Sequence, residues 1–297
     1  MVDFEILTPE LNQKFHKDGY LVIPGFLRED EITALLTRSK ELLDEFSLDG
    51  HPLTCFTTDE SGDKKHIRFF LEDEAFGEDG KLNRPKELAV NKMGHALHEL
   101  DPIFRSVTLE NPRLQQLVLE LGFHRSPLVL QSMVIFKQPS IGGQVPEHND
   151  STFLYTDPPS ALGFWFALEE CTPQNGALSF LPGSHLRNPI TKRFVRLPEG
   201  GTGFESLSAP DPLATSSPSD YKQEPCEAGT LVLIHGSVLH KSEKNTSPHT
   251  RYAYTFHMIE SGATYDAKNW LQPTPEMPFS PLFSLPPLVA RRGGPSD

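Results

Sequence analysis

Hydrophobic residues recur at two different spacings along this chain, and the earlier part of the sequence shows the spacing of helices. From Glu29 onward the apolar side chains fall on one helical face, and the run NPRLQQLVLELG repeats this pattern until Gly122. Thr8 followed by Pro9 is typical of a helix start, because threonine caps the first turn and proline suits the first helical position. The segment YLVIPGFL between these helices predicts a strand. Residues 1–126 are thus predicted to form a largely helical part.

From residue 127 to about residue 271 the pattern changes to the shorter alternation of strands. The β-rich runs, separated by turn residues, are LVLQSMVIFKQ, GFWFALEE, GALSFLPGS, GTLVLIHGS and RYAYTFHMIE. Runs of this kind are typical of an antiparallel barrel or a jelly roll, with the earlier helices packed against one sheet. We therefore predict a mainly β fold with flanking helices, in one domain of residues 1–281 followed by a flexible tail of residues 282–297.

One long segment interrupts the β-rich part. Between Glu199 and Glu224 the sequence is rich in Gly, Ser and Pro, and it is long for a loop inside a compact domain. Loops of this length are usually lids or disordered excursions. The sequence does not decide between the two.

The net charge of -13 narrows the set of partners. Proteins that bind nucleic acids need clustered Lys and Arg to neutralise phosphates, so we expect no nucleic-acid partner. A homodimer is left open. Two local basic clusters are interpreted chiefly as solvated surface charge, although either could meet an anionic ligand; they are Lys64, Lys65 and Arg68, and Lys192, Arg193 and Arg196.

The cysteines and the apolar content bear on the compartment. Cys55, Cys171 and Cys226 lie far apart and lack CxxC spacing, which argues against a disulfide framework or a zinc knuckle. The N-terminus is acidic without an apolar signal segment, and no window reaches the roughly 18 apolar residues of a membrane span. We therefore expect a cytoplasmic protein that has no membrane partner.

The short run HND carries the first sign of chemistry. A mononuclear iron(II) oxygenase needs two imidazoles and one carboxylate on one side of the metal. His148 and Asp150 are two residues apart, and at a strand end such side chains can point the same way. A second histidine must come from a later strand, where His235 and His240 are both available. We choose His240 because Arg251 opens the next strand, placed to bind the far carboxylate of a dicarboxylate co-substrate.

Each of these residues also has an ordinary structural explanation. An H-x-D pair alone is weak evidence for a metal, and His235 is more readily a hydrogen-bonded strand histidine. His185 could satisfy backbone carbonyls, His257 could line the sheet, and Arg251 alone could form a surface ion pair. The order H-x-D, about ninety residues, His, then Arg in a β-rich context is much less probable by chance than any one part.

Several blocks of the sequence, in order, resemble the phytanoyl-CoA dioxygenase family. They are FHKDGYLVIPGFL, IRFFLE, NKMGHALHELDPIF, QSMVIFKQP, NGALSFLPGSH, GTLVLIHGSVLHKSEKN and NWLQPTPEMPF. The resemblance implies a double-stranded β-helix and an enzyme that uses Fe(II), 2-oxoglutarate and O2. It implies that His148, Asp150 and His240 are the iron ligands and that Arg251 holds the 2-oxoglutarate carboxylate.

The resemblance also implies roles that spacing alone did not indicate. Lys92, Met133, Trp165 and Ser242 match positions that line the co-substrate pocket of the family. For the first three, core packing or a surface salt bridge is an equally good physical explanation. Asn149 departs from the glutamine that relatives often carry, which is not expected to affect ligation.

The function that follows is a non-haem Fe(II)- and 2-oxoglutarate-dependent dioxygenase, most simply one that hydroxylates a C–H bond of a small organic substrate and releases succinate and CO2. Two alternatives remain at this point. One is an oxygenase of secondary metabolism that catalyses desaturation or cyclisation of a free small molecule rather than a CoA ester. The other is a non-catalytic jelly roll that binds 2-oxoglutarate or a metal.

Overall fold

The computed structural model describes residues 6–49, 67–207 and 217–283, and its first elements are helices. Helix α1 (Pro9–Asp18) begins where the Thr8 side chain accepts a hydrogen bond from the Leu11 backbone N–H, and it ends at Gly19, which has a φ of 83°. The other long helices are α2 (Glu29–Glu45) and α5 (Pro112–Leu121), with the shorter α3 (Leu97–Leu100) and α4 (Pro102–Thr108) between them. The sequence-based predictions of α1, α2 and α5 are confirmed.

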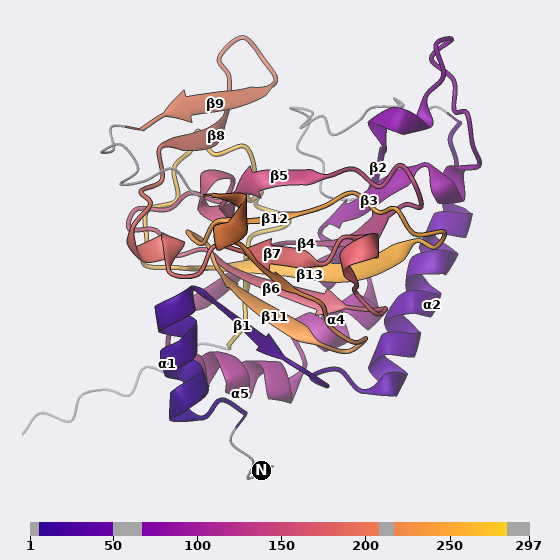
Figure 1. Cartoon of the computed structure of the whole chain (residues 1–297). Coiled ribbons are helices and arrows are strands. Elements are labelled where there is room, and N and C mark those ends of the chain that lie inside the picture. The colour runs from indigo at the N-terminus through magenta and orange to yellow at the C-terminus, as the bar shows by residue number, and fades with distance from the viewer. Residues whose placement is uncertain (1–5, 50–66, 208–216, 284–297) are drawn as a thin grey trace, which may run out of the picture.

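Most strands belong to one antiparallel sheet of eight strands (Figure 1). Along the hydrogen-bonded path, it contains β1 (Tyr20–Ile23), β11 (Leu231–His235), β6 (Leu162–Ala167), β13 (Arg251–Glu260), β4 (Pro127–Lys137), β3 (Val90–His95) and β2 (Arg68–Leu71), while β14 (Ser280–Pro281) pairs with β4 off that path. Three of these strands come from before residue 127. The early segment therefore contributes to the main sheet as well as covering it with helices.

A second antiparallel sheet of four strands faces the first. It contains β10 (Lys222–Glu224), β7 (Leu178–Phe180), β12 (His240–Ser242) and β5 (Val145–His148). Side chains of β4, β6 and β13 in the large sheet and of β5 and β12 in the small one line a common cavity. Two facing antiparallel sheets are the arrangement of a jelly roll, so the predicted fold class is confirmed; among the described residues, the two sheets do not join into a closed barrel.

The large sheet is covered on both faces because its strands are apolar at successive positions. On one face, Phe164, Tyr254 and Phe256 belong to a hydrophobic core shared with the helices. On the other face, Trp165 and Ala253 belong to a separate, smaller cluster. Figure 1 shows α1 and α5 below this sheet and α2 along its right side. Helices therefore cover one face and leave the other for the second sheet.

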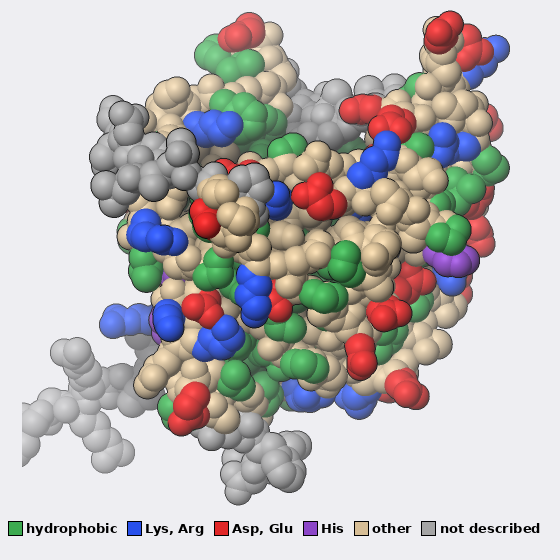
Figure 2. Space-filling view, viewed as in Figure 1, with side chains coloured by type: hydrophobic (Ala, Val, Ile, Leu, Met, Phe, Trp, Pro, Cys, Tyr) green, Lys and Arg blue, Asp and Glu red, His purple; other side chains and the backbone are tan. Residues whose placement is uncertain are grey.

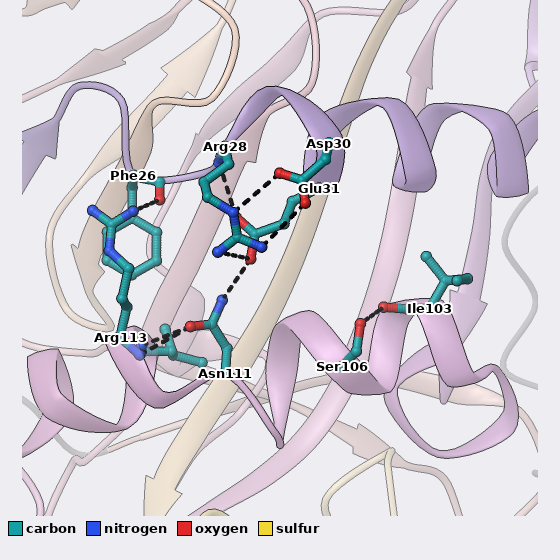
Figure 3. A network of polar contacts seen from close by, with 9 residues as sticks. Phe26, Arg28, Asp30, Glu31, Ile103, Ser106, Asn111 and Arg113 are labelled. Atoms are coloured by element: carbon teal, nitrogen blue, oxygen red, sulfur yellow. Dashed lines mark hydrogen bonds and ion pairs between the residues drawn. The ribbon is translucent and has the colours of Figure 1, made fainter. Parts of the chain in front are cut away.

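A polar network ties the helices together at the outer side of that core (Figure 3). At the start of α2, the Arg28 backbone N–H donates to the Glu31 carboxylate at 2.8 Å. Asn111, which caps α5 through its side-chain oxygen, donates from its amide nitrogen to Glu31 at 3.4 Å. Arg113 donates to the Phe26 carbonyl at 2.7 Å. These contacts fix the helix layer against which the main sheet packs.

The segment predicted as one long loop contains regular structure. Thr202–Ser206 form β9, which pairs with β8 (Lys192–Arg196), and Phe204 lies opposite Phe194. Alternate residues of such a ribbon share one face, and this phenylalanine pair stabilises it. The expectation of a continuous loop is therefore wrong for this part, while residues 208–216 lie outside the described residues. Figure 1 shows the β8–β9 ribbon standing above the two sheets.

Two further expectations concern the cysteines and the C-terminal tail. Cys171 and Cys226 are free thiols whose backbones pair across adjacent segments; Cys55 lies outside the described residues. Leu282, at the start of the predicted tail, is buried, and residues 284–297 lie outside the described residues.

Candidate active site

His148 ends strand β5, and its ring is held by the strand's own backbone. The Nδ1 atom lies 2.8 Å from the carbonyl oxygen of Pro146. A carbonyl can only accept a hydrogen bond, so Nδ1 carries the proton and the lone pair of Nε2 is left for another partner. The ring is thereby oriented as a nitrogen ligand before any metal binds.

Asp150 opens a short helical turn that follows His148 directly. The side chain of Asn149 caps this turn, because its oxygen accepts hydrogen bonds from the Thr152 backbone N–H at 2.9 Å and from the Thr152 hydroxyl at 3.0 Å. The turn bends the chain so that the carboxylate of Asp150 faces back toward His148, with Oδ1 3.7 Å from Nε2. Asn149 thus shapes the turn without approaching the metal position itself.

His240 begins β12, directly opposite His148 across the small sheet. Its Nδ1 lies 3.1 Å from the Val238 carbonyl, so it too presents Nε2, which is 3.7 Å from Oδ1 of Asp150. One possible ligand atom from each of the three residues lies within 4.8 Å of the others. Burial lowers the pKa of His240 to about 4, with a further contribution from the neighbouring His148. At neutral pH the ring is therefore uncharged, as a metal ligand must be.

A third histidine completes the surroundings of the carboxylate. Nε2 of His257, on β13, lies 3.2 Å from Oδ2 of Asp150, and Nδ1 of His257 lies 3.4 Å from the Gln131 amide. Gly163 leaves room for this contact, since a Cβ there would lie 3.2 Å from the Asp150 oxygen. Burial raises the pKa of Asp150, but His240, His257 and His148 outweigh it and hold that pKa well below its ordinary value.

These side chains line a cavity of about 430 Å³. Arg251, which begins β13, points into the same cavity and is buried. Its guanidinium carbon lies 5.2 Å from the centre of the Trp165 ring. Its Nε and Nη1 atoms have no hydrogen-bond partner among the described residues. A buried guanidinium with unused donors is costly unless an anion binds there.

The other residues carried over from the family resemblance line the same cavity, namely Lys92, Met133, Trp165 and Ser242. Burial lowers the pKa of Lys92 to about 8. The structure brings them together with the three candidate ligands and Arg251, so none of them lies in a remote part of the core.

Sequence reasoning missed several residues of this cavity, and two of them make polar contacts with its predicted members. One is His257, which was considered only as a residue that lines the sheet. The other is Lys137, whose Nζ atom donates to the hydroxyl of Ser242 at 2.6 Å. A signal was available for Lys137, because it lies four residues after Met133 on one strand and side chains on a strand return to the same face every second residue.

A second, wider cavity of about 840 Å³ adjoins this one. The two cavities share His148, Val145 and Phe153 in their linings. The β8–β9 ribbon contributes Lys192 and Phe204 to the wider cavity, and the Lys192 amine lies 4.5 Å from the centre of the Phe204 ring. A molecule in this wider cavity would reach the candidate metal position past His148.

The rejected histidines lie elsewhere. His235 ends β11 and accepts a hydrogen bond from the Ser237 N–H, as expected for a strand histidine. His185 contacts the His16 carbonyl at 3.0 Å, in agreement with its structural interpretation.

The two basic clusters separate in the structure. Arg193 forms ion pairs with Glu205 and Asp266, and Arg196 donates to the Trp270 carbonyl. Of this cluster, only Lys192 lines the wider cavity. In the other cluster, Lys64 and Lys65 lie outside the described residues.

The family is shown by sequence comparison. The model of the phytanoyl-CoA dioxygenase family (PhyH) matches residues 15–253. The chain belongs to the phytanoyl-CoA dioxygenase family. A mouse relative, phytanoyl-CoA dioxygenase domain-containing protein 1, is 44% identical over 295 residues, covering 94% of this chain and 99% of its own. A phytanoyl-CoA dioxygenase of Arabidopsis thaliana is 43% identical over 290 residues, covering 94% and 98%. The resemblance inferred from the sequence blocks is confirmed, and with it the prediction of a dioxygenase.

Solved structures with the same fold are more distant in sequence. The α-ketoglutarate-dependent carbocyclase SnoK from nogalamycin biosynthesis has a TM-score of 0.62 at 20% identity, covering 92% of this chain and 96% of its own. EctD from S. alaskensis with bound Fe has a TM-score of 0.60 at 18% identity, covering 100% and 88%. A second EctD structure contains 2-oxoglutarate and 5-hydroxyectoine. At these identities the comparison establishes the fold.

The surface adds little about partners. Figure 2 shows acidic and basic side chains interspersed over one face of the molecule. Among the described residues, no helix combines the length and apolar character needed to cross a membrane. The cytoplasmic location expected from the sequence stays a prediction, and a homodimer stays open.

Proposed function

We propose that this protein is a non-haem Fe(II)- and 2-oxoglutarate-dependent dioxygenase that oxidises a C–H bond of a small organic substrate, with release of succinate and CO2. The observation that carries the proposal is the pairing of two features in one cavity. His148, Asp150 and His240 offer two imidazole nitrogens and one carboxylate oxygen, and the buried Arg251 lies in the same cavity with donors to spare.

The donor set fits iron(II) on chemical grounds. Two imidazoles and one carboxylate, leaving other positions open, are typical of non-haem iron oxygenases, whereas magnesium and calcium sites rely on oxygen ligands. Both histidines have their protons held on Nδ1 by backbone carbonyls, so both Nε2 atoms can bind without rearrangement. His257 supports the remaining oxygen of Asp150, as outer ligands of metal sites usually do.

The protein's own contribution is to bind, orient and exclude water. Bound Fe(II) with 2-oxoglutarate and O2 supplies the oxidising power, as in other enzymes of this cofactor class. Arg251 neutralises the far carboxylate of 2-oxoglutarate, and the Trp165 ring beside it shields that ion pair from solvent. Lys92 and Met133 line the walls of the cavity that would hold the co-substrate.

The substrate belongs in the wider cavity next to His148. Its lining is mixed, with aromatic side chains from Phe153 and Phe204, one cation at Lys192 and one acid at Glu147. This lining suits a small molecule with an apolar body and polar substituents. Hydroxylation is the simplest outcome, and desaturation or cyclisation would use the same ligands.

The deciding experiment is an anaerobic titration of the metal-free protein with Fe(II) and 2-oxoglutarate, followed by the visible charge-transfer band of the chelate. We expect the band in the wild type and not in His148→Ala, with the fold of both confirmed by circular dichroism. A folded wild type without the band would overturn the proposal. Succinate release under air, with or without substrate, then separates a catalyst from a protein that only binds 2-oxoglutarate.

A further inference from the structure

Lys137 is a buried lysine for which the ligand set and Arg251 leave no role. It is the last residue of β4 and only 3% exposed. Its Cα pairs with that of Arg251 across the sheet, so the two side chains share the cavity face. Its amine donates to the Ser242 hydroxyl on the opposite sheet at 2.6 Å. A hydroxyl is a neutral partner and cannot balance a buried ammonium.

The stem of Lys137 is held in place by Gly176, in the turn before β7. A Cβ at position 176 would lie 2.4 Å from Cε and 2.8 Å from Cδ of the lysine. The backbone of this turn therefore passes directly over the side chain and confines it. The amine is fixed at Ser242 rather than free to turn toward solvent.

The charges around the cavity are unequal. Arg251, Lys137, Lys92 and Lys241 line it, while Asp150 is the one carboxylate among the described lining residues. Asp150 faces His148, His240 and His257. Around Arg251 and Lys137, the described lining residues therefore offer cations and a hydroxyl but no carboxylate, which is the arrangement expected for a carboxylate-binding site.

We propose that Lys137 joins Arg251 and Ser242 in binding the distal carboxylate of 2-oxoglutarate, and that it takes up a proton when the co-substrate binds. This inference rests on the proposed function and goes further, since it makes Lys137 a positioning residue that selects a 2-oxo diacid over a 2-oxo monoacid. Without the second carboxylate, Arg251 keeps its unused donors and Lys137 has only the neutral Ser242 hydroxyl as a partner.

The protonation behaviour follows from the surroundings of the amine. Burial lowers the pKa of Lys137 to about 7, and Arg251 adds to this effect, while Glu72, Glu243 and Cys171 oppose it. Above neutral pH the empty site therefore holds a largely uncharged amine. A bound carboxylate favours the charged form, so it raises the pKa and draws a proton from solution.

The test is calorimetric binding to Fe(II)-loaded protein without oxygen at pH 8, in two buffers of different ionisation enthalpy. 2-Oxoglutarate is compared with 2-oxopentanoate, which has the same chain length but lacks the distal carboxylate. We expect Lys137→Met to weaken the binding of 2-oxoglutarate by about 10- to 100-fold, the cost of losing a hydrogen bond to a charged group. The affinity for 2-oxopentanoate should stay nearly unchanged. Lys244→Met removes a lysine outside the cavity, whose amine lies 2.8 Å from Glu74, and should change the binding of neither ligand.

Proton uptake gives a second readout that a purely structural lysine would not move. Wild type should take up more protons with 2-oxoglutarate than with 2-oxopentanoate, because only the diacid has a carboxylate that can reach Lys137. This comparison needs no variant, so it decides the question even if Lys137→Met fails to fold.

The outcomes separate the two proposals. If wild type binds 2-oxoglutarate but shows no extra proton uptake, or if Lys137→Met weakens both ligands equally, the role of Lys137 is wrong and the proposed function stands. If wild type binds neither ligand, the proposed function itself fails.

Discussion

The two faces of strand β13 have different relationships to stability and to function. Tyr254 and Phe256 project from one face into the core that the helices cover, where they stack with Phe166 and Phe164. Arg251 and His257 project from the other face into the cavity. Because side chains alternate between the two faces, neighbouring residues of this strand either stabilise the core or line the cavity.

This difference shows that burial on the covered face offsets the free-energy cost of the charged groups on the cavity face. The covered face gains free energy from apolar burial. The cavity face holds a guanidinium with unpaired donors and a carboxylate among three histidines, all removed from water. Such groups lower stability until a ligand binds. Substitutions on the two faces should therefore affect stability in opposite directions.

The largest effect is expected on the cavity face at Asp150. Asp150→Ala removes the single oxygen ligand, so metal affinity should fall well beyond the roughly 10- to 100-fold cost of an outer-ligand change. The metal-free protein should stay folded, because the change also removes a buried charge. Metal content after dialysis and circular dichroism measure the two halves. Retention of iron at wild-type affinity would contradict the assignment.

Phe256→Ala tests the covered face. The ring is fully buried and stacks on Phe164 with 4.7 Å between centroids. We expect the free energy of unfolding to fall by about 3–5 kcal/mol, the usual cost of truncating a core phenylalanine. Chemical denaturation measures this loss. Saturating Fe(II) and 2-oxoglutarate should still produce the charge-transfer band if enough protein remains folded.

Arg251→Met sharpens the comparison, because it should weaken the binding of 2-oxoglutarate without lowering the stability of the protein. The 2-oxoglutarate concentration for half-maximal binding should rise about 10- to 100-fold, the range for a lost charge-assisted hydrogen bond. The ligand-free variant should melt at the same temperature as wild type or higher, since an unpaired buried charge is gone. Arg251→Lys serves as the charge-retaining control. A marked fall in melting temperature would show that Arg251 supports the fold itself.

The smallest effect concerns the pH dependence of stability. Burial lowers the pKa of His235 to about 4, below the ordinary value of 6.5. The unfolded chain then binds more protons between these pH values, so stability falls as the pH drops from 6.5 toward 4, by at most about 1.4 kcal/mol per pH unit for this group. His235→Gln should flatten that slope in denaturation experiments at several pH values. An unchanged slope would assign it to other groups.

The sequence indicated much of this arrangement. Apolar spacing and capping residues predicted the three long helices and most central strands of the large sheet, but not α3, α4, β2 or β3. The order of His148, Asp150, His240 and Arg251 indicated that these four residues would meet. Alternation predicts which residues of one strand share a face. It does not say which strands lie opposite each other, since that depends on long-range pairing.

The residues that escaped prediction show this limit. The contact of His257 with Asp150 joins a strand of the large sheet to a turn after the small one. The hydrogen bond from Lys137 to Ser242 also crosses between sheets. In the segment from Glu199 to Glu224, Gly and Ser suggested a loop, but the pairing of Phe204 with Phe194 outweighed the local preference for a loop.

The β8–β9 ribbon pairs with neither of the two main sheets, yet it supplies part of the wall next to His148. An element attached in this way can change in sequence and length without shifting the register of the strands that hold the ligands. Selection can therefore act on what enters the site while the oxidising centre stays the same. Among related proteins, this ribbon is therefore the element in which substrate specificity could change with the least effect on the geometry of the metal ligands.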